Sequence, residues 1–107
     1  MKPGQDHEKQ IKKRYNGYRV PGSGNLPNLK GDVYFEDYMV EGKDTDAKSF
    51  SVTLAIWNKL EREAYMAGKM PLLMPRIQGK CLVVMDEHLF QELEEARKRY
   101  KELTSSD

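Results

Sequence analysis

The feature that most constrains the fold of this chain is the segment from Gly31 to Lys43, which reads G-D-V-Y-F-E-D-Y-M-V-E-G-K. Two short runs of β-branched and aromatic residues meet in it at the polar pair Glu36-Asp37, and such runs favour strands. We therefore predict a β-hairpin that turns at this pair. In a symmetric hairpin the opposed residues are Phe35–Tyr38, Tyr34–Met39, Val33–Val40 and Asp32–Glu41.

The hairpin gathers charged groups on one face of the sheet. Directly opposed residues share a face, and so do residues two apart on one strand, so Asp32, Glu41 and Lys43 are expected to converge. Opposed like charges cost stability. A divalent cation between the two acids would remove that cost, and hard cations such as Mg²⁺ prefer carboxylate oxygens. The structural alternative is a solvated hairpin face with a Glu–Lys pair.

Periodicity along the rest of the chain predicts a small α/β fold, with a mixed sheet and flanking helices. At 107 residues the chain is expected to form a single domain spanning residues 1–107, with residues 1–6 flexible. The expected elements are a helix over 7–15 capped by Asp6, a strand over 18–20, the hairpin, a helix over 53–67, strands over 70–74 and 80–85, and a helix over 87–103 capped by Asp86.

Three further expectations concern packing. Cys81 stands in an apolar run and is expected to be a small buried residue rather than a nucleophile. His7 is expected at the surface. The last predicted helix carries a seam of apolar residues that step by four and three, a spacing typical of helix–helix packing. This seam consists of Leu89, Leu93, Ala96, Tyr100 and Leu103. It could cover the sheet or form a dimer interface, and we favour the first.

Charge is unevenly distributed along the chain. Residues 1–30 carry seven Lys or Arg against two acids, whereas the rest carries eleven basic and fifteen acidic residues. A basic first third fits either a solvated face or a polyanion-binding surface. No apolar run approaches the length of about 20 residues that crosses a bilayer, and the first residues do not resemble a signal segment. A lone cysteine excludes an internal disulfide. We expect a cytoplasmic protein.

Three short motifs add a family resemblance. Pro21-Gly22-Ser23-Gly24, Gly31-Asp32-Val33 and Val40-Glu41-Gly42-Lys43 occur in this order ahead of an amphipathic helix. Together they resemble the PD-(D/E)XK nuclease superfamily, and within it the small archaeal- and phage-type Holliday junction resolvases. The resemblance implies a restriction-endonuclease-like core. It also implies an Mg²⁺- or Mn²⁺-dependent endonuclease of a bacterial, archaeal or phage source that acts on branched DNA as a homodimer.

The resemblance also assigns residues. The first-helix acid, the motif Asp and the E-x-K pair fall on Glu8, Asp32, Glu41 and Lys43, with the three acids as metal ligands. Ser23 matches a loop serine near the junction backbone, and we count it with the catalytic residues. The residues expected to contact DNA are Lys12, Lys13, Arg14, Arg19, Ser23 and Lys30.

Two other functions stay open at the level of sequence. One is a nuclease of the same superfamily that acts on a nicking or flap substrate. The other is a non-enzymatic DNA-binding or assembly module in which the carboxylates are structural.

Overall fold

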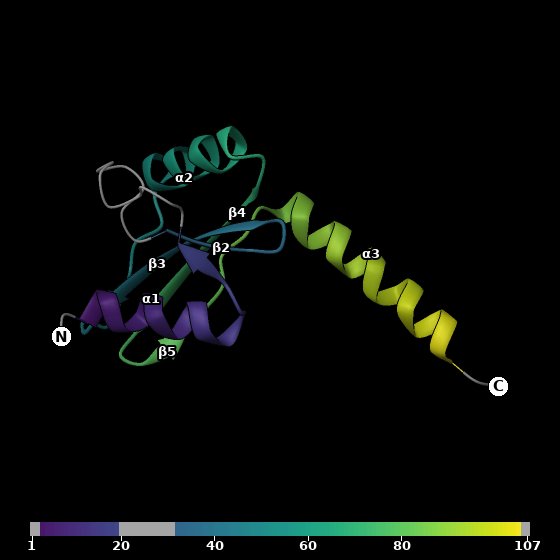
Figure 1. Ribbon diagram of the computed structural model, residues 1–107, viewed down its shortest axis with the longest axis horizontal. Coiled ribbons are helices and arrows are strands. Elements are labelled where there is room, and N and C mark those ends of the chain that lie inside the picture. The colour runs from purple at the N-terminus through teal and green to yellow at the C-terminus, as the bar shows by residue number, and fades with distance from the viewer. Residues whose placement is uncertain (1–2, 20–31, 106–107) are drawn as a thin grey trace.

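The computed structural model describes residues 3–19 and 32–105, with side chains described for residues 6–18 and 33–105. The elements in chain order are α1 (Pro3–Arg14), β1 (Tyr18–Arg19), β2 (Asp32–Phe35), β3 (Tyr38–Thr45), α2 (Leu54–Met66), β4 (Met70–Ile77), β5 (Lys80–Cys81) and α3 (Glu87–Thr104). They build a small α/β fold around a mixed sheet (Figure 1). Among the described residues, no helix combines the length and the apolar character needed to cross a membrane.

The sheet has five strands in the order β1-β2-β3-β4-β5. Strands β2 and β3 form the predicted hairpin, and its register is the predicted one at all four residue pairs, from Asp32 opposite Glu41 to Phe35 opposite Tyr38. Strand β4 runs parallel to β3, and β1 and β5 are antiparallel to their neighbours. A parallel neighbour requires a crossover connection, and α2 supplies it.

Helix α2 covers one face of the sheet. Its Leu60 and Ala64 are buried against Met39 of β3 and Leu73 of β4. Thr53 caps the helix, because its hydroxyl accepts a hydrogen bond from the Ile56 N–H at 3.2 Å. The predicted helix over 53–67 is thus confirmed to within a residue at each end.

Helix α1 covers the other face (Figure 1). Ile11 packs there against Val33 and Val40 of the hairpin. Gly42 lies directly beneath α1: a Cβ added at this position would lie 3.1 Å from Ile11 Cδ1 and 3.3 Å from His7 Cδ2. A side chain at residue 42 would therefore crowd the Ile11 and His7 side chains of α1 and force them to shift. This packing explains the glycine between Glu41 and Lys43.

Polar contacts fix the first turns of α1, and they correct two predictions. His7 is fully buried rather than at the surface, and its Nε2 lies 2.8 Å from the Met74 carbonyl oxygen. The helix begins at Pro3, so Asp6 lies inside its first turn and is not the N-cap. The Asp6 carboxylate faces Arg76, with Nη2 and Oδ2 3.6 Å apart.

Strands β4 and β5 also depart from prediction. Strand β4 continues through Pro75 to Ile77, and the turn lies at Gln78-Gly79, where both residues have positive φ (47° and 85°). The expected strand over 80–85 is reduced to Lys80–Cys81 and a bridge between Val84 and Leu73. Cys81 is exposed rather than buried.

Helix α3 has the predicted start but not the predicted packing. Asp86 caps it, since its carboxylate accepts a hydrogen bond from the His88 N–H at 2.8 Å. Leu89, in the first turn, is buried in the core on the α1 side. Beyond this turn the helix extends away from the sheet (Figure 1). The expectation that its apolar seam covers the sheet is therefore wrong.

Candidate functional site

The candidate site begins with the two acids that the hairpin brings together. Asp32 lies directly opposite Glu41 across the β2–β3 ladder. Lys43 is two residues further along β3, on the face of Glu41, and its Nζ lies 3.3 Å from Glu41 Oε1. The register and this ion pair confirm that Glu41 and Lys43 share a face and that the backbone of Asp32 stands across from them.

The surroundings of Glu41 are partly apolar. Across the β3–β4 ladder it pairs with Leu73, a fully buried residue of the core on the α2 side. The Glu41 side chain is itself only 19% exposed. A partly buried carboxylate needs a cation or hydrogen-bond donors nearby. Lys43 supplies one such cation in the described part of the chain.

Glu63 is an acid of this region that the sequence analysis missed. It lies on α2, three residues after the buried Leu60, so it borders the apolar stripe of the helix. Burial raises the pKa of Glu63, and the neighbouring Glu41 carboxylate raises it further, while Lys59 and Arg62 act in the opposite direction. The signal in the sequence was an acid at the edge of a buried helical stripe. Only the fold shows that this edge lies near Glu41.

The fit of these residues to a metal ion depends on how many donors converge. Among the side chains that the structure describes, no three Asp, Glu, His or Cys residues lie close enough together to hold one. The Asp32 side chain is outside that part, so the described ligand on this face is Glu41, with Glu63 near it. In chemical type, two acidic residues paired in register and a neighbouring lysine suit a hard divalent cation.

Glu8, the third predicted ligand, approaches β3 from the opposite face. Its Cγ lies 3.6 Å from the position that a Cβ of Gly42 would occupy, on the side of the sheet that α1 covers. Side chains alternate along a strand, so Glu41 and Lys43 point to the α2 side. The structure thus brings Glu8 close to the Glu41–Lys43 segment of β3 without placing it on the face of Glu41.

The predicted DNA-contacting residues fall into three groups. Lys12, Lys13 and Arg14 are exposed at the end of α1. Arg19 belongs to β1, where only its backbone is described. Ser23 and Lys30 lie outside the described residues, as does the Pro21–Gly24 motif.

Comparison of the chain with protein-family models, with curated proteins and with solved structures found no match. A functional assignment therefore depends on the chemistry of the hairpin and on the motifs that it contains.

Proposed function

We propose that this protein is a metal-dependent endonuclease of the PD-(D/E)XK type that resolves four-way DNA junctions. The observation that carries the proposal is the register of the hairpin, in which Asp32 stands opposite Glu41 and Lys43 pairs with Glu41 on the same face. A mixed sheet with a helix on each face fits the restriction-endonuclease-like core that the motifs imply.

The proposed chemistry is hydrolysis of a phosphodiester. The Asp32 and Glu41 carboxylates would hold Mg²⁺ or Mn²⁺, which when bound lowers the pKa of an attacking water and neutralises phosphate charge. Glu8 is kept as a third metal ligand only because the family resemblance assigns it that role. The Lys43 ammonium stands beside this position and would stabilise the negative charge that develops on the phosphorus oxygens as water attacks and the sugar oxygen leaves.

The proposed substrate is branched DNA held mainly through its phosphates. The exposed Lys12, Lys13 and Arg14 form a cationic end of α1, and Arg19, Ser23 and Lys30 would extend this surface. Phosphate contacts position a protein on DNA without reading its sequence, as a shape-selective nuclease requires. Two copies of the chain would place one site on each of two opposed strands.

The first experiment is cleavage of a labelled four-way junction, beside a linear duplex of matched sequence, with and without Mg²⁺ or Mn²⁺. We expect paired, metal-dependent cuts confined to the junction. Asp32→Asn and Glu41→Gln should abolish cleavage while keeping junction binding. Asp46→Asn, which neutralises an exposed acid just after β3, should cleave as the wild type does. Cleavage by either purified site variant would show that the proposed site is wrong. Cleavage of flap or nicked substrates alone would mean that the substrate is one of these rather than a four-way junction.

A specific observation favours a second candidate, a non-catalytic DNA-binding module. Lys43 already neutralises Glu41, and the described side chains bring no three metal-ligating groups together. Metal binding separates the two functions, because a ligand held only by the folded state raises the melting temperature. For the nuclease we expect Mg²⁺ or Mn²⁺ to raise the melting temperature of the wild type but not of Asp32→Asn. The same change in melting temperature in the two proteins, or no change in either, would favour the non-catalytic DNA-binding module.

A further inference from the structure

Helix α3 presents an apolar seam that its own chain does not cover. Only Leu89 of the seam is buried. Leu93 is exposed, and so are Tyr100 and Leu103, at 69% and 86%. The helix projects from the body from its second turn onward (Figure 1). Most helical stability in proteins comes from packing an apolar face, so an exposed seam of this kind is expected to have a partner.

The seam has the pattern of a two-stranded coiled coil. Its five residues alternate steps of four and three along α3, which places them at the two core positions of successive heptads. In that frame Glu92 and Arg99 flank the core at the same type of position, one heptad apart. Such flanking charges determine which helix pairs with which, and in which direction.

We propose that α3 pairs with α3 of a second copy of this chain as an antiparallel coiled coil. When Leu93 lies opposite the partner's Ala96, Leu89 lies opposite the partner's Tyr100. This register also sets Glu92 against the partner's Arg99, and the symmetry of the dimer repeats the pair. The seam of one α3 would thus be covered by the same seam of the partner's α3. Two pairs of opposite charge would join the two helices.

The charges favour the antiparallel direction over the parallel one. A parallel dimer would set Glu92 against Arg97 of the other helix. Arg97 is already engaged by Glu94 of its own helix, with Nη2 and Oε1 2.7 Å apart and a second bond from Nε at 3.1 Å. Arg99 forms no ion pair with any residue that the structure describes, although Glu95 precedes it by four positions. Arg99 can therefore bind the partner's Glu92 without giving up an existing contact of its own. Glu92 lies 3.3 Å from His88 Nε2 of its own helix, and this contact is common to both directions and does not distinguish them.

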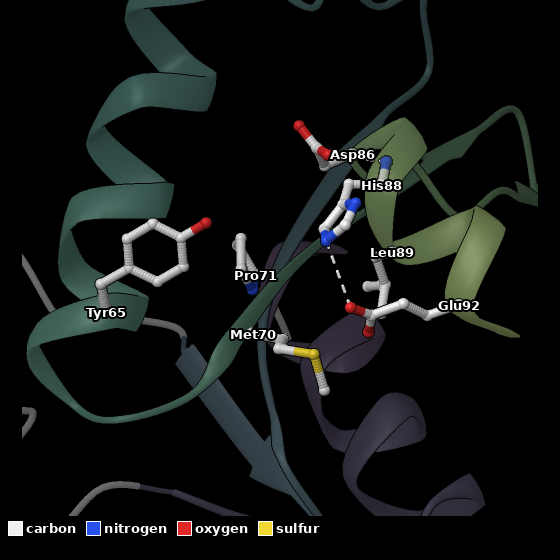
Figure 2. A pocket seen from close by; sticks show the side chains of 7 residues that line it. All are labelled: Tyr65, Met70, Pro71, Asp86, His88, Leu89 and Glu92. Atoms are coloured by element: carbon white, nitrogen blue, oxygen red, sulfur yellow. Dashed lines mark hydrogen bonds and ion pairs between the residues drawn. The ribbon is translucent and has the colours of Figure 1, made fainter.

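A cavity at the base of α3 fits the same register. It measures about 220 Å³ and lies between Tyr65 of α2, Met70 and Pro71 of β4, and Leu89 (Figure 2). In the proposed pairing the partner's Leu103 comes level with Asp86, at the mouth of this cavity. Leu103, which is 86% exposed in the single chain, would then cover the apolar surface at the start of the other helix.

This inference rests on α3 alone and does not require nuclease activity, although it names a surface for the dimer proposed above. The test is the molecular mass of the full chain in solution, measured by sedimentation over a range of concentrations. We expect a dimer, and we expect Leu93→Glu to give a folded monomer whose far-ultraviolet circular dichroism shows that the sheet is kept. A wild type that stays monomeric, or a dimer that Leu93→Glu leaves intact, would overturn the proposal.

Charge exchange tests the register without disturbing the core. Glu92→Arg alone and Arg99→Glu alone should each raise the dissociation constant about five- to tenfold, because each replaces two attractive pairs with two repulsive ones. The double variant E92R/R99E should return to the wild-type value. The control Glu95→Arg makes the same charge change on the outer face of α3 and should leave the dimer unchanged. Rescue of Glu92→Arg by Arg97→Glu instead would mean a parallel pair and would overturn the register.

Discussion

The contact between Asp44 and Arg76 gives the sharpest stability prediction. Arg76 donates two hydrogen bonds to the Asp44 carboxylate, Nη2 to Oδ2 at 2.6 Å and Nε to Oδ1 at 3.0 Å. Both side chains are largely buried, at 7% and 14% exposure. Removing one member of a buried ion pair costs about 3–5 kcal/mol, because the remaining charge is left without its partner.

For Asp44→Asn the expected loss lies below that range. Arg76 keeps weaker contacts with Gln10, at 3.3 Å, and with Asp6, at 3.6 Å, which compensate in part. We expect a loss of about 2–3 kcal/mol in the free energy of unfolding. With a typical dependence on urea, this loss moves the unfolding midpoint down by roughly 1–2 M. All variants are compared at one protein concentration, since dimerisation would add to the apparent stability.

The pH dependence of the same variant checks the mechanism. Hydrogen bonding from Arg76 lowers the pKa of Asp44 below its usual 3.8 in the folded state. A lowered folded pKa contributes stability that is complete above the unfolded value and is lost as the pH falls through the folded one. The difference in the free energy of unfolding between the wild type and Asp44→Asn should therefore shrink as the pH falls below about 4.

Asp6→Asn is the matched control for this prediction. Asp6 is 47% exposed and lies 3.6 Å from the same guanidinium, so its loss should cost less than about 1 kcal/mol. An Asp44→Asn protein within about 0.5 kcal/mol of the wild type would show that the Asp44–Arg76 pair does not stabilise the packing of β3 against β4.

Two further predictions concern the candidate site. Lys43→Ala should lower junction cleavage by roughly 10²-fold with little change in melting temperature, because Lys43 is half exposed and its ion pair contributes little to stability; unfolding of this variant would instead support a structural role for the pair. Glu63→Gln should raise the melting temperature of the metal-free protein near pH 7. The pKa of Glu63 is raised in the folded state, so its ionised form opposes folding once the pH exceeds the usual value of 4.5, and melting curves that coincide at pH 7 would contradict this.

The hairpin could be predicted from the sequence because the information that specifies it is local. Alternation of side chains and the central pair Glu36-Asp37 determine which residues face each other, so the opposition of Asp32 and Glu41 follows from the order of the residues alone. Glu63 could not be found in this way. The α2 crossover brings Glu63 near enough to Glu41 for the two charges to interact, and no periodic pattern in the sequence reports that proximity.

The predictions for His7 and Pro75 failed for related reasons. His7 is buried because its ring lies within hydrogen-bond distance of a carbonyl 67 residues away, and an isolated helix of charged residues gives no sign of that partner. Pro75 is typical of the end of a strand because it lacks an N–H. It is tolerated where β4 meets the short β5 region, and its carbonyl still accepts a hydrogen bond from the Leu82 N–H at 2.9 Å.

The prediction for α3 failed over the surface that its apolar seam contacts. The spacing from Leu89 to Leu103 correctly indicated a helix, and it predicted that the apolar seam of this helix packs on another surface, but spacing does not say which surface that is. In the folded chain α1 already covers one face of the sheet and α2 covers the other. The described part of the chain thus leaves α3 only the contact of Leu89 at the edge of the core. A seam that continues for nearly four more turns beyond Leu89 is best matched by an identical seam, which is why we assign it to a second copy.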